Sequence, residues 1–156
     1  MKRIGRVSLY ILLGSFILIQ FLRTEKNVSD EVSPFDFLEV NADMPDMLQA
    51  SFKTSCYDCH SNNTNYPWYA HLAPFSWIIE QHIRNGKSEM NFAGYGTLDD
   101  RHKIGLLDDI CEAVSDSTMP PQNYLMLHPD AMLSEEDIAS ICDWTETEAM
   151  GIIRKK

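Results

Sequence analysis

The chain has 156 residues, which is enough for one domain and a short appendage because a single hydrophobic core uses about 100–150 residues. It carries 13 Lys and Arg against 23 Asp and Glu, so its formal net charge is −10. Four of the basic residues precede Thr24, which leaves 9 basic against 23 acidic residues in the rest of the chain. Such a surface disfavours nucleic acid and anionic lipid headgroups, and we expect no nucleic-acid partner.

Residues 1–23 begin with basic residues and continue as an apolar run. From Gly5 to Leu22 the run has 18 residues, about 27 Å of helix, which just spans a hydrocarbon core of roughly 30 Å. A cleaved secretory signal is the alternative, but such signals end in small residues, and this run ends in Gln-Phe-Leu-Arg. We predict an uncleaved anchor that crosses the membrane once.

The basic residues on the N-terminal side of this run indicate that the N-terminus stays in the cytoplasm. The chain from Thr24 onward is then exported. We therefore expect a protein of the bacterial inner membrane whose domain lies in the periplasm. That compartment is oxidising, so free zinc–thiolate sites are less expected there than in the cytosol.

Residues 24–43 are polar and acidic and lack apolar periodicity. They are predicted to form a tether or an extended wrap whose second half packs on the domain through four apolar residues, which are Phe35, Phe37, Leu38 and Val40. The domain is expected over residues 44–150, followed by a basic tail at residues 151–156.

Four segments of the domain show helical signals, namely a capping or acidic start followed by apolar residues at steps of three and four. They begin near Pro45, Ser76, Thr97 and Ser134. The second is expected to be capped by Ser76 and to stop at Gly86, and the fourth has the capping pattern Ser134-x-x-Asp137. No segment alternates as a strand would, so we predict an all-α domain of about four helices.

Three loops are long for so small a domain, at residues 61–75, 86–97 and 116–133. Loops longer than about 12–15 residues are usually functional or wrapped around something. Four short helices bury only a modest core. We therefore expect a large apolar cofactor in the middle of the domain to supply the missing core.

Cys56-Tyr57-Asp58-Cys59-His60 has the spacing C-x-x-C-H, the attachment signature of c-type haem. On a helical turn Cys56, Cys59 and His60 are i, i+3 and i+4, so two thiols can reach the haem vinyl groups while the imidazole reaches the iron. Zinc would need two further ligands, and a redox dithiol would need a βαβ context that this chain lacks. The pattern favours one haem c, covalently attached through Cys56 and Cys59, with His60 as a ligand of the iron.

The second axial ligand is expected on a loop that can fold over the far haem face. Met119 lies in such a loop, where two prolines follow its soft thioether, and His–Met ligation raises the haem potential relative to two histidines. His82 is the first alternative, although a lone histidine on an apolar helix face is more often a core residue. Further methionines and histidines compete, namely Met90, Met126, Met132, His71, His102 and His128.

Aromatic residues gather around the motif and the Met119 loop. Three of them are predicted to contact haem or to hydrogen-bond its propionates, namely Trp68, Trp77 and Tyr124. Pro67 or Pro74 is expected to present a backbone carbonyl to Nδ1 of His60, the usual way to orient a ligating imidazole.

Cys111 and Cys142 occupy corresponding places in the apolar stripes of two predicted helices. They are either buried free thiols or a disulfide that links the helices, and an oxidising compartment allows the bridge. The sequence does not give the Cα separation that decides between the two.

Three blocks of sequence extend the pattern beyond the pentapeptide, namely CYDCHSNNTNYPWY, LAPFSWIIEQHIRNGKSEMNF and MPPQNYLMLHPDAMLSEEDIASICDW. With them the chain resembles a bacterial family of small membrane-anchored c-type cytochromes, the haem-binding domain family, over about residues 35–147. The resemblance implies a cytochrome-c-like all-α fold, thioether attachment at Cys56 and Cys59, His60 as proximal ligand and Met119 as distal ligand. It also includes Asn91-Phe92 and His128-Pro129 in the family pattern without giving their roles.

Together these features predict a membrane-tethered mono-haem cytochrome that carries single electrons on the periplasmic face, with redox proteins of the respiratory chain as partners. With both axial positions filled, the iron has no position for a substrate, so we expect a carrier and not an enzyme. The alternative is a haem-based gas or redox sensor, or a peroxidase-like domain, in which Met119 is labile. A third possibility is a structural subunit in which haem only completes the core.

Overall fold

The structure, a computed structural model, describes residues 2–155 and consists there of helices joined by loops, without strands. Its α-helices are α1 (Lys2–Ile19), α2 (Phe37–Val40), α3 (Asp46–Ser55), α4 (Tyr57–His60), α5 (Phe75–Glu89), α6 (Asp100–Ser115), α7 (Gln122–Leu125) and α8 (Glu135–Arg154). Three short 3₁₀ helices complete the order, namely η1 (Trp68–His71), η2 (Phe92–Thr97) and η3 (Pro129–Ala131). The all-α prediction is confirmed, and the four predicted helices of the domain correspond to α3, α5, α6 and α8.

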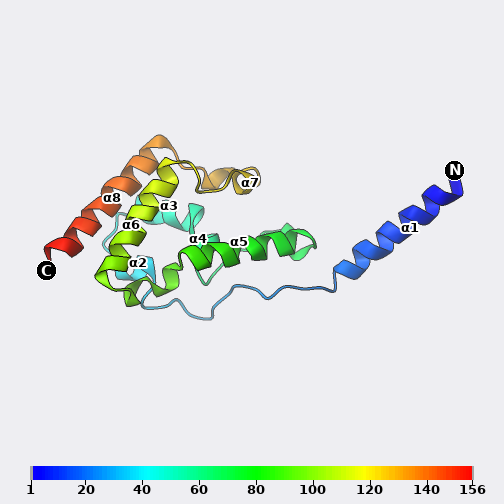
Figure 1. The fold of residues 1–156 in the computed structure, drawn as a ribbon, viewed down its shortest axis with the longest axis horizontal. Coiled ribbons are helices and arrows are strands. Elements are labelled where there is room, and N and C mark those ends of the chain that lie inside the picture. Colours follow the sequence, from blue (N-terminus) through cyan, green and yellow to red (C-terminus); the bar gives the residue numbers. More distant parts are fainter. Residues whose placement is uncertain (1, 156) are drawn as a thin grey trace.

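Helix α1 extends away from the domain (Figure 1). Its apolar side chains are largely exposed. It includes Lys2, Arg3 and Arg6 and ends at Ile19, before the end of the predicted apolar run. Within residues 2–155 no helix is both long enough and apolar enough to cross a membrane. The predicted membrane-spanning helix is therefore not found, since the uncharged part of α1, Val7–Ile19, is only about 20 Å long.

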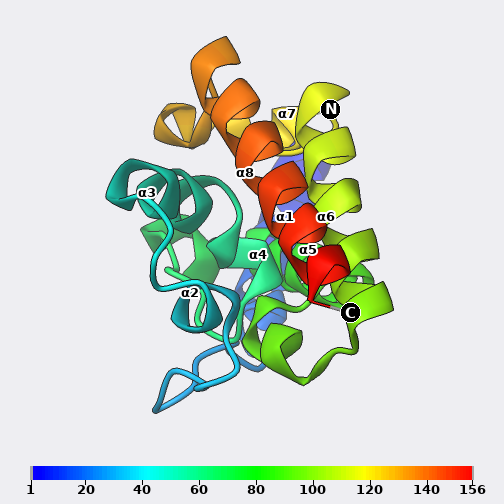
Figure 2. The same cartoon turned by 90° about the vertical axis from the view of Figure 1, so that its left-hand side faces the viewer.

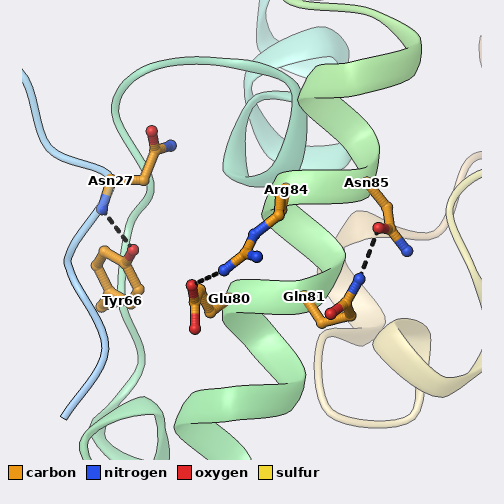
Figure 3. Close-up of polar contacts among 6 residues, drawn as sticks. All are labelled: Asn27, Tyr66, Glu80, Gln81, Arg84 and Asn85. Atoms are coloured by element: carbon orange, nitrogen blue, oxygen red, sulfur yellow. Dashed lines mark hydrogen bonds and ion pairs between the residues drawn. The ribbon is translucent and has the colours of Figure 1, made fainter.

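The acidic segment 24–43 lies against the domain, in agreement with the second of its two predicted forms, the extended wrap, and we call it the strap. The side-chain amide of Asn27 donates hydrogen bonds of 2.7 and 2.9 Å to loop 61–66. The backbone N–H of Asn27 donates to the hydroxyl of Tyr66 at 2.7 Å, as Figure 3 shows. Lys87 on α5 donates to the side-chain oxygen of Asn27 at 2.6 Å. Even the first half of the strap is thus held against the domain.

The second half of the strap supplies the centre of the core. Phe37 on α2 is fully buried. Its ring lies between 4.9 and 5.6 Å, centroid to centroid, from four other aromatic rings, those of Phe52, Phe92, Tyr95 and Trp144. Such aromatic pairs contribute about 0.5–1.5 kcal/mol each beyond the area that they bury. Protein side chains alone pack around Phe37 in this part of the core.

Helices α6 and α8 lie side by side along one face of the domain, with α2 and α3 on the other side of the core (Figure 2). Their apolar stripes meet through Leu107 and Ile141, which are both fully buried. Cys111 and Cys142 form a disulfide between these helices, with their Cα atoms 4.8 Å apart. The open alternative between free thiols and a bridge is therefore decided in favour of the bridge.

The predicted helix starts are confirmed where the signal is local. Asp99 caps α6, and Ser134 and Asp137 form a complete capping box at the start of α8. Helix α5 differs from its prediction, because it begins at Phe75 with Pro74 as its N-cap and continues through Gly86 to Glu89. Helix α8 continues to Arg154, so residues 151–154 extend the helix and do not form a separate tail.

Candidate functional site

The C-x-x-C-H pentapeptide forms the predicted helical turn. The backbone carbonyl of Cys56 accepts hydrogen bonds from the N–H groups of Cys59 at 3.2 Å and His60 at 3.0 Å. The three side chains border one cavity of about 240 Å³ between α4, α5 and the segment that precedes α7. The same cavity is lined by three further residues with ligand or aromatic side chains, which are His82, Met119 and Tyr124.

A hydrogen bond to the backbone carbonyl of Met90 fixes the orientation of the His60 ring. Its Nδ1 lies 2.9 Å from the carbonyl oxygen of Met90, at the end of α5. A carbonyl only accepts, so Nδ1 carries the proton and Nε2 is left with its lone pair for a metal. The expectation that Pro67 or Pro74 supplies this carbonyl is therefore wrong. The ring of His60 also packs on Phe92, with their centroids 5.7 Å apart.

The two cysteines of the turn are free thiols. Burial raises the pKa of Cys56 to about 12, helped by the neighbouring Cys59. Burial likewise raises the pKa of Cys59 to about 11, helped by the charge of Asp58. Both groups are therefore thiols and not thiolates at neutral pH, which disfavours a redox dithiol because the thiolate is the reactive form.

A zinc site has no support in the part of the chain that the structure describes. No group of three or more His, Cys, Asp and Glu side chains is placed there so as to hold a metal ion. Cys111 and Cys142 are joined to each other and cannot ligate. Since structural zinc takes four protein ligands, the two thiols of the turn are too few.

Met119 lies at the rim of the cavity, with 40% of its side-chain surface exposed. Its backbone N–H donates to the carbonyl of Ala113 at the end of α6, at 3.1 Å. The structure therefore brings Met119 and the alternative ligand His82 to the same cavity. Among the competing methionines, Met126 and Met132 are strongly exposed and do not line it.

Comparison with protein families adds one finding. Residues 14–147 match the family model described as the haem-binding domain. The chain belongs to the haem-binding domain family. The matched range includes the C-x-x-C-H turn, α5 and Met119, so it contains the whole lining of the cavity. No curated protein and no solved structure matches the chain.

Two features show how well the cavity of this haem-binding domain fits haem, namely the close approach of α5 at Gly86 and the side chains in its lining that can bind haem. A Cβ at Gly86 would lie 2.9 Å from the backbone oxygen of Cys59 and 3.2 Å from its Cβ, so only glycine lets α5 approach the turn this closely. Two free thiols, an imidazole with a free Nε2 and a thioether at the rim are the donors that a covalently held haem uses. The volume of about 240 Å³ is below the range of about 300–1,000 Å³ typical of ligand sites.

The aromatic residues predicted to contact haem lie in three different places. Trp68 is 77% exposed and packs edge-on against Tyr69, away from the cavity. Trp77 donates its indole N–H to the carbonyl of Leu22 at 2.9 Å, next to the end of α1. Neither tryptophan lines the haem cavity, so the prediction for them is not supported. Tyr124 does line it, but its hydroxyl is donated to Asp58 at 2.9 Å.

Three residues of the site have roles that the motif did not indicate. Met90 acts through its backbone carbonyl, which no side-chain pattern marks. Gly86 has a sequence signal, an isolated glycine inside a helical pattern, which was interpreted as a helix end. Asn91 caps η2 by accepting the N–H of Ala93, and the next residue, Phe92, packs against His60.

Proposed function

We propose that this haem-binding domain is a mono-haem c-type cytochrome that transfers single electrons. The observation that carries the proposal is the cavity at which Cys56, Cys59 and His60 meet Met119. Bound haem supplies reversible one-electron chemistry at its iron. The chain supplies attachment, two axial ligands and an environment that excludes water.

The two cysteines, the histidine and the methionine that line the cavity each have a distinct role in this proposal. Cys56 and Cys59 would hold haem through two thioether bonds, each made by addition of one S–H across one vinyl group, with sulfur bonded to one vinyl carbon and hydrogen to the other. His60 offers Nε2 to the iron, and the carbonyl of Met90 holds its ring in position. Met119 would offer its thioether from the rim of the same cavity.

Closed coordination supports a carrier over an enzyme. If His60 and Met119 occupy both axial positions, no position is left for a substrate, and only electrons can be exchanged. The exposure of Met119 at the rim favours one second candidate, a gas or redox sensor in which this ligand is displaced. The two functions differ in whether an added ligand reaches the iron.

The test is addition of carbon monoxide to the ferrous holoprotein, purified from a host competent for cytochrome maturation. A carrier should bind carbon monoxide slowly and in small amount, and should titrate reversibly with one electron per protein. Rapid stoichiometric binding would overturn the carrier proposal and favour the sensor. Replacing Met119 with Ala should convert the slow response into the fast one and abolish the thioether-to-iron band at the red end of the spectrum.

Location and partners follow as parts of the same proposal. The disulfide between α6 and α8 and the proposed haem attachment both suit an oxidising, exported location such as the periplasm. The exposed apolar side chains of α1 suit association with the outer face of the inner membrane. The acidic surface favours basic redox proteins of the respiratory chain as electron donors or acceptors.

A further inference from the structure

Asp58 lies between the two cysteines of the turn but takes no part in the proposed attachment. Its Oδ2 accepts the hydroxyl of Tyr124 at 2.9 Å, and its Oδ1 accepts the backbone N–H of Asn65 at 2.9 Å. Tyr124 belongs to α7, which follows Met119 closely along the chain. A side-chain contact therefore joins the attachment turn directly to the segment that carries the proposed second axial ligand.

Tyr124 is held from its other side by His128. Their rings stack with centroids 4.2 Å apart and an interplanar angle of 11°. Nε2 of His128 is joined by a hydrogen bond of 2.5 Å to the hydroxyl of Tyr69 in η1. The chain of four side chains thus begins on α4, which borders the cavity, and ends on η1, which packs against α5, another element that borders it.

The loop at residues 116–133 is also fixed at its two ends. At its start the backbone N–H groups of Thr118 and Met119 both donate to the carbonyl of Ala113 at 3.1 Å. Near its end Ala131 is buried, and η3 packs against α3. The backbone of Met119 is thus anchored, while its side chain is partly exposed. Between the two ends of the loop, Tyr124 is hydrogen-bonded to Asp58 and His128 to Tyr69.

We propose that Asp58, Tyr124, His128 and Tyr69 form a latch that holds the Met119 loop over the C-x-x-C-H turn. Tyr124 is then a positioning residue for the second axial ligand. The inference rests on the proposed function, because it requires Met119 to ligate. It also gives a role to the His-Pro pair of the family pattern, since Pro129 starts η3 and His128 is its N-cap residue, which fixes the imidazole beside Tyr124.

The test compares Tyr124→Phe with Tyr66→Phe in the ferrous holoprotein. Tyr124→Phe removes the hydroxyl that binds Asp58 and keeps the ring that stacks on His128. Tyr66→Phe is a matched control, because it removes a hydroxyl that binds the strap at Asn27. A hydrogen bond to a carboxylate is among the stronger ones, so carbon monoxide should bind about tenfold faster to Tyr124→Phe than to wild type. Tyr66→Phe should bind it at the wild-type rate.

Hydrogen exchange of the same holoproteins gives a readout independent of the iron. Backbone amides of residues 118–128 should exchange faster in Tyr124→Phe and remain as in wild type in Tyr66→Phe. Asp58→Ala removes the other partner of this bond and also the acceptor of the Asn65 N–H, so its effect should be at least as large, and adding Tyr124→Phe to it should cause no further change. Equal carbon monoxide rates and equal exchange in Tyr124→Phe and Tyr66→Phe, with the thioether band intact in wild type, would overturn the latch alone. Absence of that band in wild type would overturn the proposed ligation, and the latch with it.

Discussion

One side of the domain is filled by packed protein side chains, whereas the other side encloses the cavity at the C-x-x-C-H turn. On the core side, α2, α3, α6 and α8 enclose buried aromatic and aliphatic side chains around Phe37, and a disulfide joins α6 to α8. On the cavity side, α4, α5 and the Met119 loop surround open space, two free thiols and a histidine with one unused ring nitrogen. The two sides meet at Phe92, which packs on both Phe37 and His60. Away from that contact, we expect variants on the core side to change mainly stability and variants on the cavity side to change mainly haem binding.

The largest effect on stability is expected from Phe37→Ala. The ring is fully buried among four other aromatic rings, and removing such a side chain costs about 3–5 kcal/mol. The free energy of unfolding, measured by chemical denaturation with circular dichroism, should fall by that amount. Phe35→Ala is the control from the same strap, because Phe35 is exposed. Similar losses in both variants would contradict the placement of the core.

Removing the disulfide should have the next largest effect. Cys111 and Cys142 are 31 residues apart, and closing a loop of this length stabilises the folded state by about 3–4 kcal/mol in the chain-entropy view. The Cys111→Ser, Cys142→Ser double variant should lose about that much in denaturation while still attaching haem. Loss of attachment with unchanged stability would show that the two sides are not separate.

A smaller effect, confined to the cavity side, is expected from Gly86→Ala. The new Cβ would lie 2.9 Å from the backbone oxygen of Cys59, so α5 or the turn must shift, and overpacking of this kind costs about 1–3 kcal/mol. The fraction of protein that carries haem should fall. Gly105→Ala in α6 is the matched control, since nothing lies within 4 Å of its Cβ position. That variant should be neutral or more stable by up to about 1 kcal/mol.

The smallest effect is expected where the strap meets loop 61–66. Asn27→Ala removes the side-chain hydrogen bonds to this loop and to Lys87, with a net cost of about 1–2 kcal/mol. Proteolysis or hydrogen exchange should increase within residues 24–33 and not in α6 or α8. Gln81→Ala removes an exposed side chain of α5 whose amide donates to Asn85 on the same helix, as Figure 3 shows, and should change neither. A uniform increase across the domain would show that the strap is part of the cooperative core.

Features with a local physical cause were predictable from the sequence. The capping box of α8 needs only Ser134 and Asp137 three positions apart, and the C-x-x-C-H turn needs only helical geometry to place its side chains on one face. The all-α class followed from the same periodicity. The sequence also identified the stripes of α6 and α8, but pairing Cys111 with Cys142 required the distance between two helices.

Features that depend on distant segments were not predictable in this way. Gly86 resembles a helix end in the sequence, and only the closeness of Cys59 explains a glycine inside α5. The carbonyl that orients His60 belongs to Met90, and every residue has such a group, so composition gives no preference. Trp68 and Trp77 are close to the motif along the chain, but η1 and the start of α5 direct them away from the cavity.

Covalent attachment of haem at the turn is the central claim, and intact-mass measurement of the purified protein tests it most directly. Wild-type protein from a host competent for cytochrome maturation should carry the mass of one haem and keep its colour in the protein fraction after extraction with acidified organic solvent. The Cys56→Ala, Cys59→Ala double variant should fold, as judged by circular dichroism, and lack that mass. A wild-type mass equal to that of the polypeptide alone, with all colour in the solvent, would contradict the account.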